Sequence, residues 1–208
     1  MSIPAPFDVY AVVILLLLQA VILWKYNILR KENVQLKGVA ELDPLTQILN
    51  RRSFFEKGEE YLNSLSGGSE RRQGNQRKSV CGIMLDLDFF KSLNDSYGHA
   101  FGDKVLREVA GLVKRLLREE DDIFGRYGGE EFVILLGDGS DAIVVADKLR
   151  EAIEKLPLYT KAGRRVEVTA SLGIACEVQY CPLEELFERA DKALYKAKEK
   201  GRNMVVAG

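Results

Sequence analysis

Two short apolar runs, residues 123–127 and 132–136, are separated by Gly128-Gly129-Glu130-Glu131. Apolar runs joined across a Gly-Gly pair predict a β-hairpin with the glycines at its tip, so that Glu130 and Glu131 begin the returning strand. Adjacent strand residues point to opposite faces of a sheet, and therefore at least one of these two carboxylates faces solvent or a cation. The plain alternative is an ordinary hairpin with solvated acids.

A second acidic element follows a longer apolar run. Residues 80–85 read Val-Cys-Gly-Ile-Met-Leu and lead into Asp86-Leu87-Asp88. This pattern predicts a buried central strand with carboxylates at its C-terminal edge, where open α/β sheets usually build their sites. Mg²⁺ in proteins takes one or two carboxylates together with phosphates and water, and Asp86 with Glu130 would supply such a pair. The alternative is that Asp86 and Asp88 only end the strand and cap the next element.

Four motifs, two of which contain these acids, occur in order along the chain. They are Asp43-x-Leu45-Thr46-x-x-Leu49-Asn50-Arg51-Arg52, Asp86-x-Asp88-x-Phe90-Lys91-x-x-Asn94-Asp95-x-x-Gly98-His99-x-x-Gly102-Asp103, Gly128-Gly129-Glu130-Glu131-Phe132 and Ala197-Lys198-x-x-Gly201-Arg202-Asn203. In this order they resemble the signatures of GGDEF-domain diguanylate cyclases, in a GGEEF variant. The resemblance covers about residues 42–206.

The resemblance implies an α/β sandwich, a palm-like nucleotidyl cyclase fold with a central, mostly antiparallel sheet flanked by helices. It also implies that the chain condenses two GTP molecules into cyclic di-GMP and releases two pyrophosphates. In that reaction the 3′-hydroxyl of one GTP attacks the α-phosphate of the other, assisted by metal ions. Because one domain holds one GTP, the implied enzyme works as a homodimer.

The resemblance assigns the metal site to the two acidic elements. Asp86, the backbone carbonyl of Leu87 and Glu130 would bind two Mg²⁺ ions, or Mn²⁺ in their place. Glu131 lies beside them, either as a metal ligand or as a catalytic base.

The resemblance assigns the guanine base to Asn94 and Asp103. A carboxylate can accept hydrogen bonds from guanine N1–H and N2–H₂, a donor pair that adenine lacks, so Asp103 favours GTP over ATP. Some use of ATP stays open, because one residue does not decide the choice of base. Asp103 would also suit the first turn of a helix predicted over residues 103–117.

The resemblance assigns the triphosphate to two segments. The backbone N–H groups of Phe89, Phe90 and Lys91 would cradle the phosphates, a task that needs no particular side chain. The side chains of Lys198 and Arg202 would contact the triphosphate as well. For these two cations the alternative is the ordinary preference for positive charge near a helix C-terminus.

The chain departs from the family at a regulatory motif. Many members carry Arg-x-x-Asp, ending five residues before the Gly-Gly pair, as an inhibitory site for the product. Here Asp122 occupies the Asp position but Glu119 occupies the Arg position, while Arg118 and Asp121 form the pattern one residue out of register. An acid in place of the Arg repels an anionic dinucleotide, which predicts weak or absent feedback inhibition.

The N-terminal part differs in character from the rest. Residues 9–24 form an almost unbroken apolar run of 16 residues, slightly below the usual length of a spanning helix. A secretory signal would need a basic start and a cleavage site, which are missing, so a single transmembrane anchor is the preferred interpretation. Basic residues follow the run and none precedes it, which places the C-terminal part in the cytoplasm. The predicted domains are therefore an anchor (1–26), a helical linker (27–41) and a catalytic domain (42–208).

Composition excludes some other classes. A formal net charge of −1 gives no case for binding nucleic acid, and one histidine leaves little scope for a soft-metal site. Cys81, Cys176 and Cys181 have neither Cys-x-x-Cys spacing nor an even number, which predicts reduced thiols. Two other functions stay open: a non-catalytic effector that binds GTP or cyclic di-GMP, and a membrane-tethered scaffold that binds no nucleotide.

Apolar periodicity predicts the remaining elements. Helices are expected over residues 46–65, 103–117, 140–156 and 182–200, and a strand over 165–176, while the polar stretch 94–102 reads as a turn. The predicted order of elements is β-α-α-β-β-α-β-α-β.

Overall fold

The computed structural model describes residues 14–26, 40–66, 79–177 and 181–208. Residues 41–208 form one compact unit, and residues 14–26 form a helix in the unit that precedes it. No helix within the described ranges is long and apolar enough to cross a bilayer. The predicted anchor and linker extend over residues 1–13 and 27–39, which lie outside the described residues.

A six-stranded sheet forms the centre of the compact unit, in the order β1-β3-β4-β2-β7-β8. The two edge pairs, β1 with β3 and β7 with β8, are parallel, and the three inner pairs are antiparallel. A separate two-stranded sheet joins β5 to β6. In chain order the elements are β1 (Leu49–Asn50), α2 (Arg51–Ser66), β2 (Val80–Leu87), α3 (Phe90–Tyr97), α4 (His99–Leu116), β3 (Asp122–Gly128), β4 (Glu131–Leu136), the short 3₁₀ helix η1 (Gly139–Asp141), α5 (Ala142–Glu154), β5 (Leu158–Tyr159), β6 (Arg165–Val166), β7 (Ala170–Glu177), α6 (Leu183–Glu199) and β8 (Val205–Ala207).

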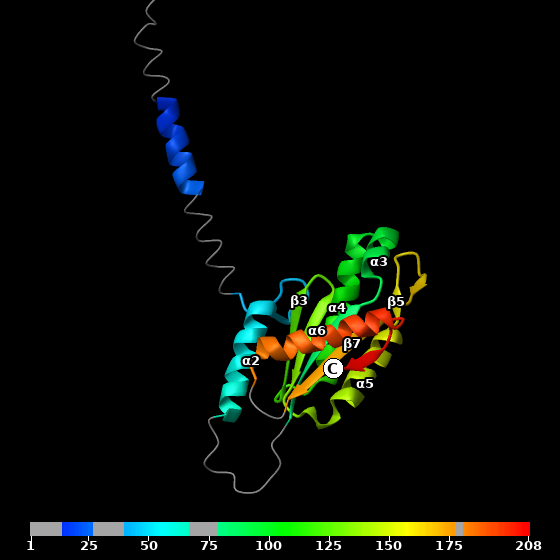
Figure 1. Ribbon diagram of the computed structural model, residues 1–208. Helices are drawn as coiled ribbons and strands as arrows, with labels where there is room; N and C mark the ends of the chain where they lie inside the picture. The colour runs from blue at the N-terminus through cyan, green and yellow to red at the C-terminus, as the bar shows by residue number, and fades with distance from the viewer. Residues whose placement is uncertain (1–13, 27–39, 67–78, 178–180) are drawn as a thin grey trace, which may run out of the picture. The chain divides into compact units, whose positions relative to one another are not determined.

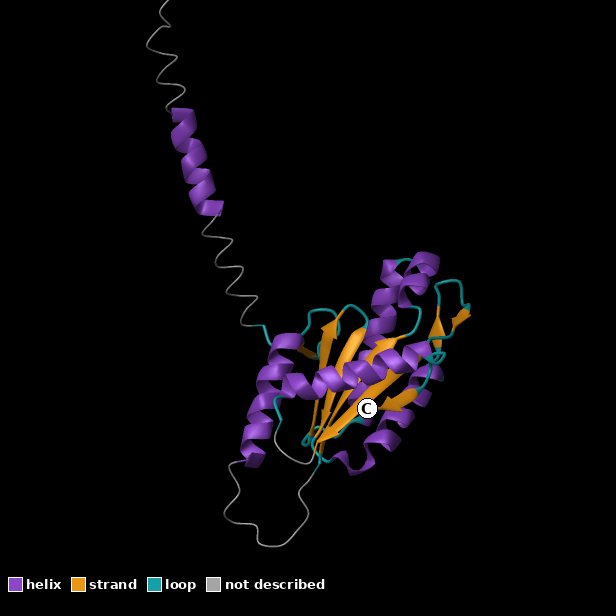
Figure 2. Cartoon of the chain, in the orientation of Figure 1, coloured by secondary structure: helices purple, strands orange, loops and turns teal. Residues whose placement is uncertain are grey.

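Helices cover both faces of the sheet, as Figures 1 and 2 show. One face packs against α4 and α5 through residues such as Val109 and Leu149. The other packs against α2 and α6 through residues such as Phe54 and Phe187. Strand β2 lies between the two layers and is buried along its whole length, which explains its continuous apolar sequence. The predicted sandwich with a mostly antiparallel sheet is confirmed.

Glycine permits the closest contact between α6 and the sheet. A side-chain carbon on Gly173 of β7 would overlap the backbone of Ala190 and Leu194 in α6. The helix can therefore lie directly on β7, and this fixes where its C-terminal end comes to rest.

The prediction of a turn over residues 94–102 is wrong. Helix α3 continues to Tyr97, and α4 begins at His99. Phe90 and Leu93 bury their side chains in the core, and this packing overrides the weak helix preference of the Ser, Asn and Asp residues around them. Asp103 therefore lies in the second turn of α4, and no acid occupies the first turn. Its position is not explained by the charge preference of a helix N-terminus.

Two further predicted elements have different bounds. Helix α2 begins at Arg51 and not at Thr46, because the Asp43 carboxylate accepts a hydrogen bond from the Thr46 backbone N–H (2.8 Å) and holds a turn there. The strand predicted over 165–176 is two strands, β6 and β7, which belong to different sheets. Helices α5 and α6 are confirmed, each slightly shorter than predicted.

The prediction of reduced cysteines is wrong for two of the three. Cys81 on β2 and Cys176 on β7 are direct register partners, with their Cα atoms 4.1 Å apart, and a disulfide joins them. Cys181 is a free thiol. The spacing of the cysteines could not reveal this bond, because it depends on the pairing register of strands 95 residues apart.

Candidate functional site

Strand pairing brings together the acidic elements predicted from the sequence. In the antiparallel pairing of β2 with β4, Asp86 is opposite Glu131, so both side chains lie on the same face of the sheet. That face is the one covered by α6, and Lys198 near the end of α6 places its ammonium 2.8 Å from Asp86 Oδ2. Glu130 is in the turn just before β4. Its backbone carbonyl accepts a hydrogen bond from the Leu87 N–H (3.4 Å), which ties the turn to the end of β2.

The local charges make this cluster a place for a cation. Burial raises the pKa of Asp86; the ammonium of Lys198 opposes this rise, while the charges of Glu130 and Asp88 add to it. Burial also raises the pKa of Glu131, and the neighbouring Asp86 charge raises it further. The carboxylates repel one another in a partly desolvated place, and a bound cation would relieve this repulsion. In the structure the Lys198 ammonium provides part of that relief.

The described residues do not build a complete protein cage for a metal ion. Within residues 14–26, 40–66, 79–177 and 181–208, no three acidic, histidine or cysteine side chains gather closely enough to hold one. Two carboxylates and a backbone carbonyl fit Mg²⁺ well, because this ion commonly completes its octahedron with substrate phosphates and water. Asp86, Glu130 and the Leu87 carbonyl are therefore suited to a divalent ion that arrives with a phosphorylated ligand.

A guanidinium fixes the hairpin tip that carries Glu130. Arg126 of β3 donates hydrogen bonds from Nε (3.0 Å) and Nη2 (2.7 Å) to the carbonyl oxygen of Gly129. Its Nη1 reaches both carboxylate oxygens of Asp43, at 3.0 and 3.2 Å. Gly129 has φ of +51°, a conformation that suits glycine. Sequence reasoning gave Arg126 no role, since its partner Asp43 is 83 residues away.

The start of α3 offers backbone donors that have no partner within the helix. Phe89 precedes the helix in the left-handed conformation, with φ of 55°. The N–H groups at the beginning of a helix have no carbonyl partner within it, and they point toward any anion placed there. The Phe90 side chain is buried in the core, so only its backbone can face a ligand, while Phe89 and Lys91 are exposed. The helix start also borders a cavity of about 450 Å³.

Asn94 and Asp103, the expected guanine ligands, lie on neighbouring helices. Asn94 is on α3 and Asp103 is on α4, and Asp103 is exposed. Asn94 Oδ1 is buried without a hydrogen-bond partner in the described part of the chain. A side-chain carbon on Gly102 would collide with this oxygen, so glycine is needed for the amide to pack against α4. An unsatisfied buried amide is costly unless a ligand or a rotation of the amide supplies a partner.

Lys198 and Arg202 reach the site from different directions. Lys198 pairs with Asp86, whereas Arg202 lies in the turn after α6 and stacks its guanidinium over the exposed Phe89 ring, 4.7 Å from the ring centroid. Arg202 is therefore next to the start of α3, and Lys198 is next to the acidic cluster. The sequence assigned only the backbone of Phe89 to the site, whereas in the structure its ring also contacts the Arg202 guanidinium.

The altered regulatory motif has a different geometry. The Asp122 carboxylate accepts hydrogen bonds from the backbone N–H of Arg118 (2.9 Å) and of Gly137 (3.4 Å), so it holds the end of the loop. Arg118, Glu119 and Asp122 border a cavity of about 380 Å³. Glu119 is exposed and brings a negative charge to its rim.

We expect Arg126→Ala to lower the free energy of unfolding by about 2–3 kcal/mol, because it leaves the mostly buried Asp43 carboxylate without its cation. Partial burial raises the pKa of Asp43, but hydrogen bonds from Thr46 and the Arg126 charge outweigh it, and the net pKa is lowered. The stabilisation is therefore present above the ordinary aspartate pKa of about 4 and is lost as the pH falls through the lowered value.

Urea unfolding of the wild type and of Arg126→Ala, from pH 7 down to pH 3, measures this effect. The difference between the two proteins should shrink as the pH falls. Arg126→Lys cannot contact the Gly129 carbonyl and the Asp43 carboxylate in the same way, so its free energy of unfolding should lie between those of the other two proteins. If the difference in unfolding free energy were the same at every pH, the contact with Asp43 would not be the source of the stabilisation by Arg126.

Comparison with known proteins agrees with this geometry. The family model described as "Diguanylate cyclase, GGDEF domain" matches residues 40–204. Diguanylate cyclase A of Treponema denticola is 36% identical over 176 residues, which are 83% of this chain and 46% of that protein. The chain thus spans less than half the length of this curated relative.

Solved structures show the same fold. The coiled coil and GGDEF domain of DgcB from Caulobacter crescentus, in complex with c-di-GMP, aligns with a TM-score of 0.73 at 28% identity, over 93% of this chain and 99% of that one. The active GGEEF domain of a diguanylate cyclase from Vibrio cholerae aligns with a TM-score of 0.64 at 28% identity, over 77% of this chain and 97% of that one. The chain belongs to the diguanylate cyclase GGDEF domain family.

Proposed function

We propose that this chain is a diguanylate cyclase of the GGEEF variant, which condenses two GTP molecules into cyclic di-GMP. The observation that carries the proposal is the meeting of Asp86, Glu131 and Lys198 on one face of the sheet, with Glu130 in the adjoining turn. Each expected residue type occupies its place in the motifs. The solved GGEEF domain from Vibrio cholerae, named as active, supports the view that this variant of the motif permits activity.

The residues of the chain would share the work of phosphoryl transfer. Asp86, Glu130 and the Leu87 carbonyl would hold two Mg²⁺, which when bound neutralise charge on the phosphates. When GTP binds, the Lys198 ammonium would leave Asp86 and contact the triphosphate instead. Glu131 has a raised pKa, and this suits a base that accepts the proton of the attacking 3′-hydroxyl.

The substrate would be held at its two ends. The backbone N–H groups of Phe89, Phe90 and Lys91 would bind phosphate oxygens, with Arg202 beside them. At the other end, Asn94 and Asp103 would bind guanine, and the unpaired Oδ1 of Asn94 supports the need for a donor there. An adenine base would offer Asp103 a poorer match.

We also propose that two copies of the chain meet to react, because one domain provides one GTP site. The 3′-hydroxyl and the α-phosphate come from different GTP molecules, so the two sites must face each other. The proposed linker over residues 27–41 would raise the local concentration of the domains, a role that the coiled coil named in the DgcB structure supports.

The proposed membrane anchor rests on sequence and exposure. In the described helix over residues 14–26, the large apolar side chains are all more than half exposed, from Ile14 to Trp24 and Tyr26. Such a helix needs an apolar environment, which lipid would provide, and the apolar run begins earlier, at Val9. The catalytic part would then be in the cytoplasm.

The central prediction concerns Glu130. The full chain, solubilised in detergent and incubated with GTP, ATP and Mg²⁺, should form cyclic di-GMP, and Glu130→Gln should form at least 100-fold less because it removes a metal-binding charge. Chromatography of the products measures both. Glu188→Gln, at an exposed position of α6, is the matched control and should keep full activity.

Other outcomes of this measurement would change the proposal. GTP binding without product from the wild type would favour a non-catalytic effector. A chain that binds no GTP would be a scaffold. Mixed dinucleotides in the presence of ATP would show that Asp103 does not restrict the base.

Feedback inhibition should be weak in the wild type and should appear in Glu119→Arg. This change removes the repulsive carboxylate and restores the Arg-x-x-Asp pattern with Asp122. Initial rates at increasing cyclic di-GMP concentration would show it. Strong non-competitive inhibition of the wild type, abolished by Arg118→Ala, would instead show that the shifted pattern is functional.

The anchor is tested by cell fractionation. The wild type should remain in the membrane pellet after alkaline extraction, whereas Leu17→Arg should release it, because a charge near the middle of the run costs about 2.5–3.5 kcal/mol. Lys57→Ala, on the surface of α2, is the control that should stay in the pellet if the wild type does. A wild type found in the supernatant would contradict the anchor.

A further inference from the structure

Asp88 is a buried carboxylate beside the acidic cluster. It is 7% exposed, and its charge has no cationic partner among the described residues. Three donors satisfy it instead: Ser171 Oγ to Oδ1 (2.7 Å), Thr169 Oγ1 to Oδ2 (2.7 Å) and the backbone N–H of Asn203 to Oδ2 (3.0 Å). The first two donors come from the start of β7 and the residue before it. The third comes from the turn after α6, so Asp88 ties that turn to the end of β2.

That turn has an unusual backbone. Gly201, Arg202 and Asn203 all have positive φ, at 118°, 65° and 45°. Left-handed residues in succession are unfavourable for side chains other than glycine, and they persist only where the surroundings hold them. Inside the turn, the Arg202 N–H donates to the Ala197 carbonyl (3.0 Å), which closes the end of α6.

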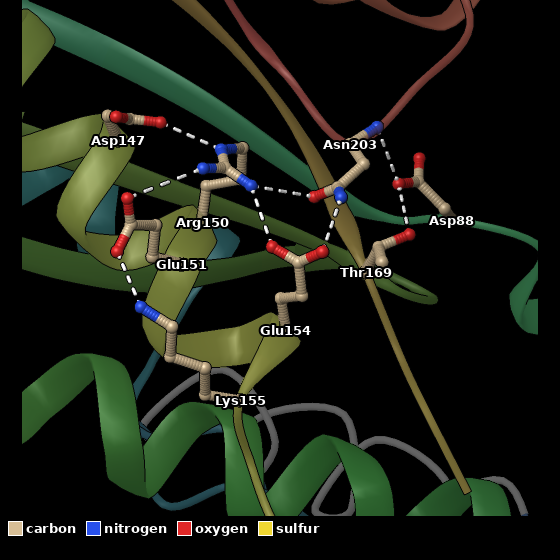
Figure 3. A network of polar contacts seen from close by, with 8 residues as sticks. All are labelled: Asp88, Asp147, Arg150, Glu151, Glu154, Lys155, Thr169 and Asn203. Carbon is tan, nitrogen blue, oxygen red and sulfur yellow. Dashed lines mark hydrogen bonds and ion pairs between the residues drawn. The ribbon is translucent and has the colours of Figure 1, made fainter.

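The side chain of Asn203 fastens the turn to α5 by hydrogen bonds, as Figure 3 shows. Its Nδ2 donates to Glu154 Oε1 (3.0 Å), and its Oδ1 accepts from Arg150 Nη1 (3.1 Å). Arg150 and Glu154 also bond to each other at 2.9 Å, so the three side chains form a closed ring. Arg150 is held in turn by Asp147 through its Nε (2.7 Å). The side-chain amide of Asn203 thus bonds to α5, and its backbone N–H bonds to Asp88.

The ring lies next to a residue with a proposed role in binding phosphate. Arg202 precedes Asn203 directly, and its guanidinium rests on the Phe89 ring at the start of α3. Asn203 is thus held from two sides, by α5 and by the end of β2, while its neighbour extends toward the free N–H groups of α3. Apart from its own hydrogen bond to Ala197, the Arg202 backbone is positioned by the contacts of its neighbour Asn203.

We propose that Asn203, with Arg150 and Glu154 of α5, positions Arg202 for the triphosphate of GTP. Asn203 acts through Arg202 and does not touch the substrate. This inference rests on the proposed function, because it names residues that prepare the phosphate end of the same site. Helix α5 contributes none of the substrate or metal ligands inferred from the motifs. In this proposal it supports GTP binding indirectly, through its contacts with Asn203.

The physical effect is preorganisation. A flexible arginine loses side-chain and backbone entropy when it binds phosphate. If the turn is already fixed before binding, most of the backbone entropy has been lost on folding and no longer weakens binding. Without the Asn203 side chain the turn would keep its backbone contacts with α6 and with Asp88, but it would have no contact with α5. Arg202 would then sample positions away from Phe89, and GTP would bind more weakly.

The test measures GTP binding by calorimetry in the full chain carrying Glu130→Gln, so that no turnover disturbs the equilibrium. Asn203→Gly removes the side chain but tolerates positive φ, and Arg150→Ala removes the ring from the α5 side. We expect each to weaken GTP binding about tenfold, comparable with one charge-assisted hydrogen bond. Lys155→Ala is the matched control, because it breaks an exposed ion pair with Glu151 on the same helix without touching Asn203.

Double variants separate positioning from general damage to the fold. If Asn203 acts through Arg202, then Asn203→Gly should weaken binding little further once Arg202→Ala is present. A merely structural role would instead lower the thermal midpoint and add its full effect to that of Arg202→Ala. Arg150→Lys should restore part of the affinity, because it keeps a donor for Asn203.

The outcomes distinguish this inference from the proposed function. Normal affinity in Asn203→Gly and Arg150→Ala, or full additivity with Arg202→Ala, would overturn the positioning role and leave the cyclase proposal standing. If neither the wild type nor the parent Glu130→Gln chain binds GTP, both are overturned. A parent that binds GTP while the wild type forms no product refutes only the cyclase, and the loss of affinity in the variants still decides the positioning role.

Discussion

The desolvated carboxylate of Asp86 is the constraint on which the site depends. Strand β2 runs between β4 and β7 with both faces covered, so a charge at its end is both buried and fixed in position. Antiparallel pairing puts Glu131 opposite it, and α6 brings Lys198 to it. Because the carboxylates repel one another in a partly desolvated place, a cation bound at this edge would stabilise them.

Two hydrogen-bonded clamps hold the irregular segments around that carboxylate. Arg126 joins the entry turn to the hairpin tip, and Asp88 joins β2 to the turn after α6. Each clamp links segments more than 80 residues apart in the chain, as the Asp43 and Asn203 contacts show. The proposed ligands lie on regular elements and on the turns between them, and these two clamps fix the turns relative to the sheet.

The sequence predicted the elements whose signal is local. The hairpin and the buried strand follow from apolar runs and a Gly-Gly pair, and the sandwich follows from their order and the resemblance. The prediction failed at α3, where burial of Phe90 and Leu93 outweighs a polar sequence, and at the Cys81–Cys176 bond, which depends on register. Of the site, the acids that gather at β2 and β4 were predicted, whereas the roles of Arg126 and Asn203 come from tertiary contacts that no spacing encodes.

Backbone strain is concentrated where phosphate is proposed to bind. Among the described residues, four other than glycine have positive φ, and three of them, Phe89, Arg202 and Asn203, border this place. Each such conformation costs of order 1–3 kcal/mol, less for Asn, and the cost falls on the folded state whether or not a ligand is present. The domain therefore gives up part of its stability to keep these segments ready. Glycine would carry less of this strain at these three positions, so the side chains that stand there are not those that the backbone conformation alone would favour.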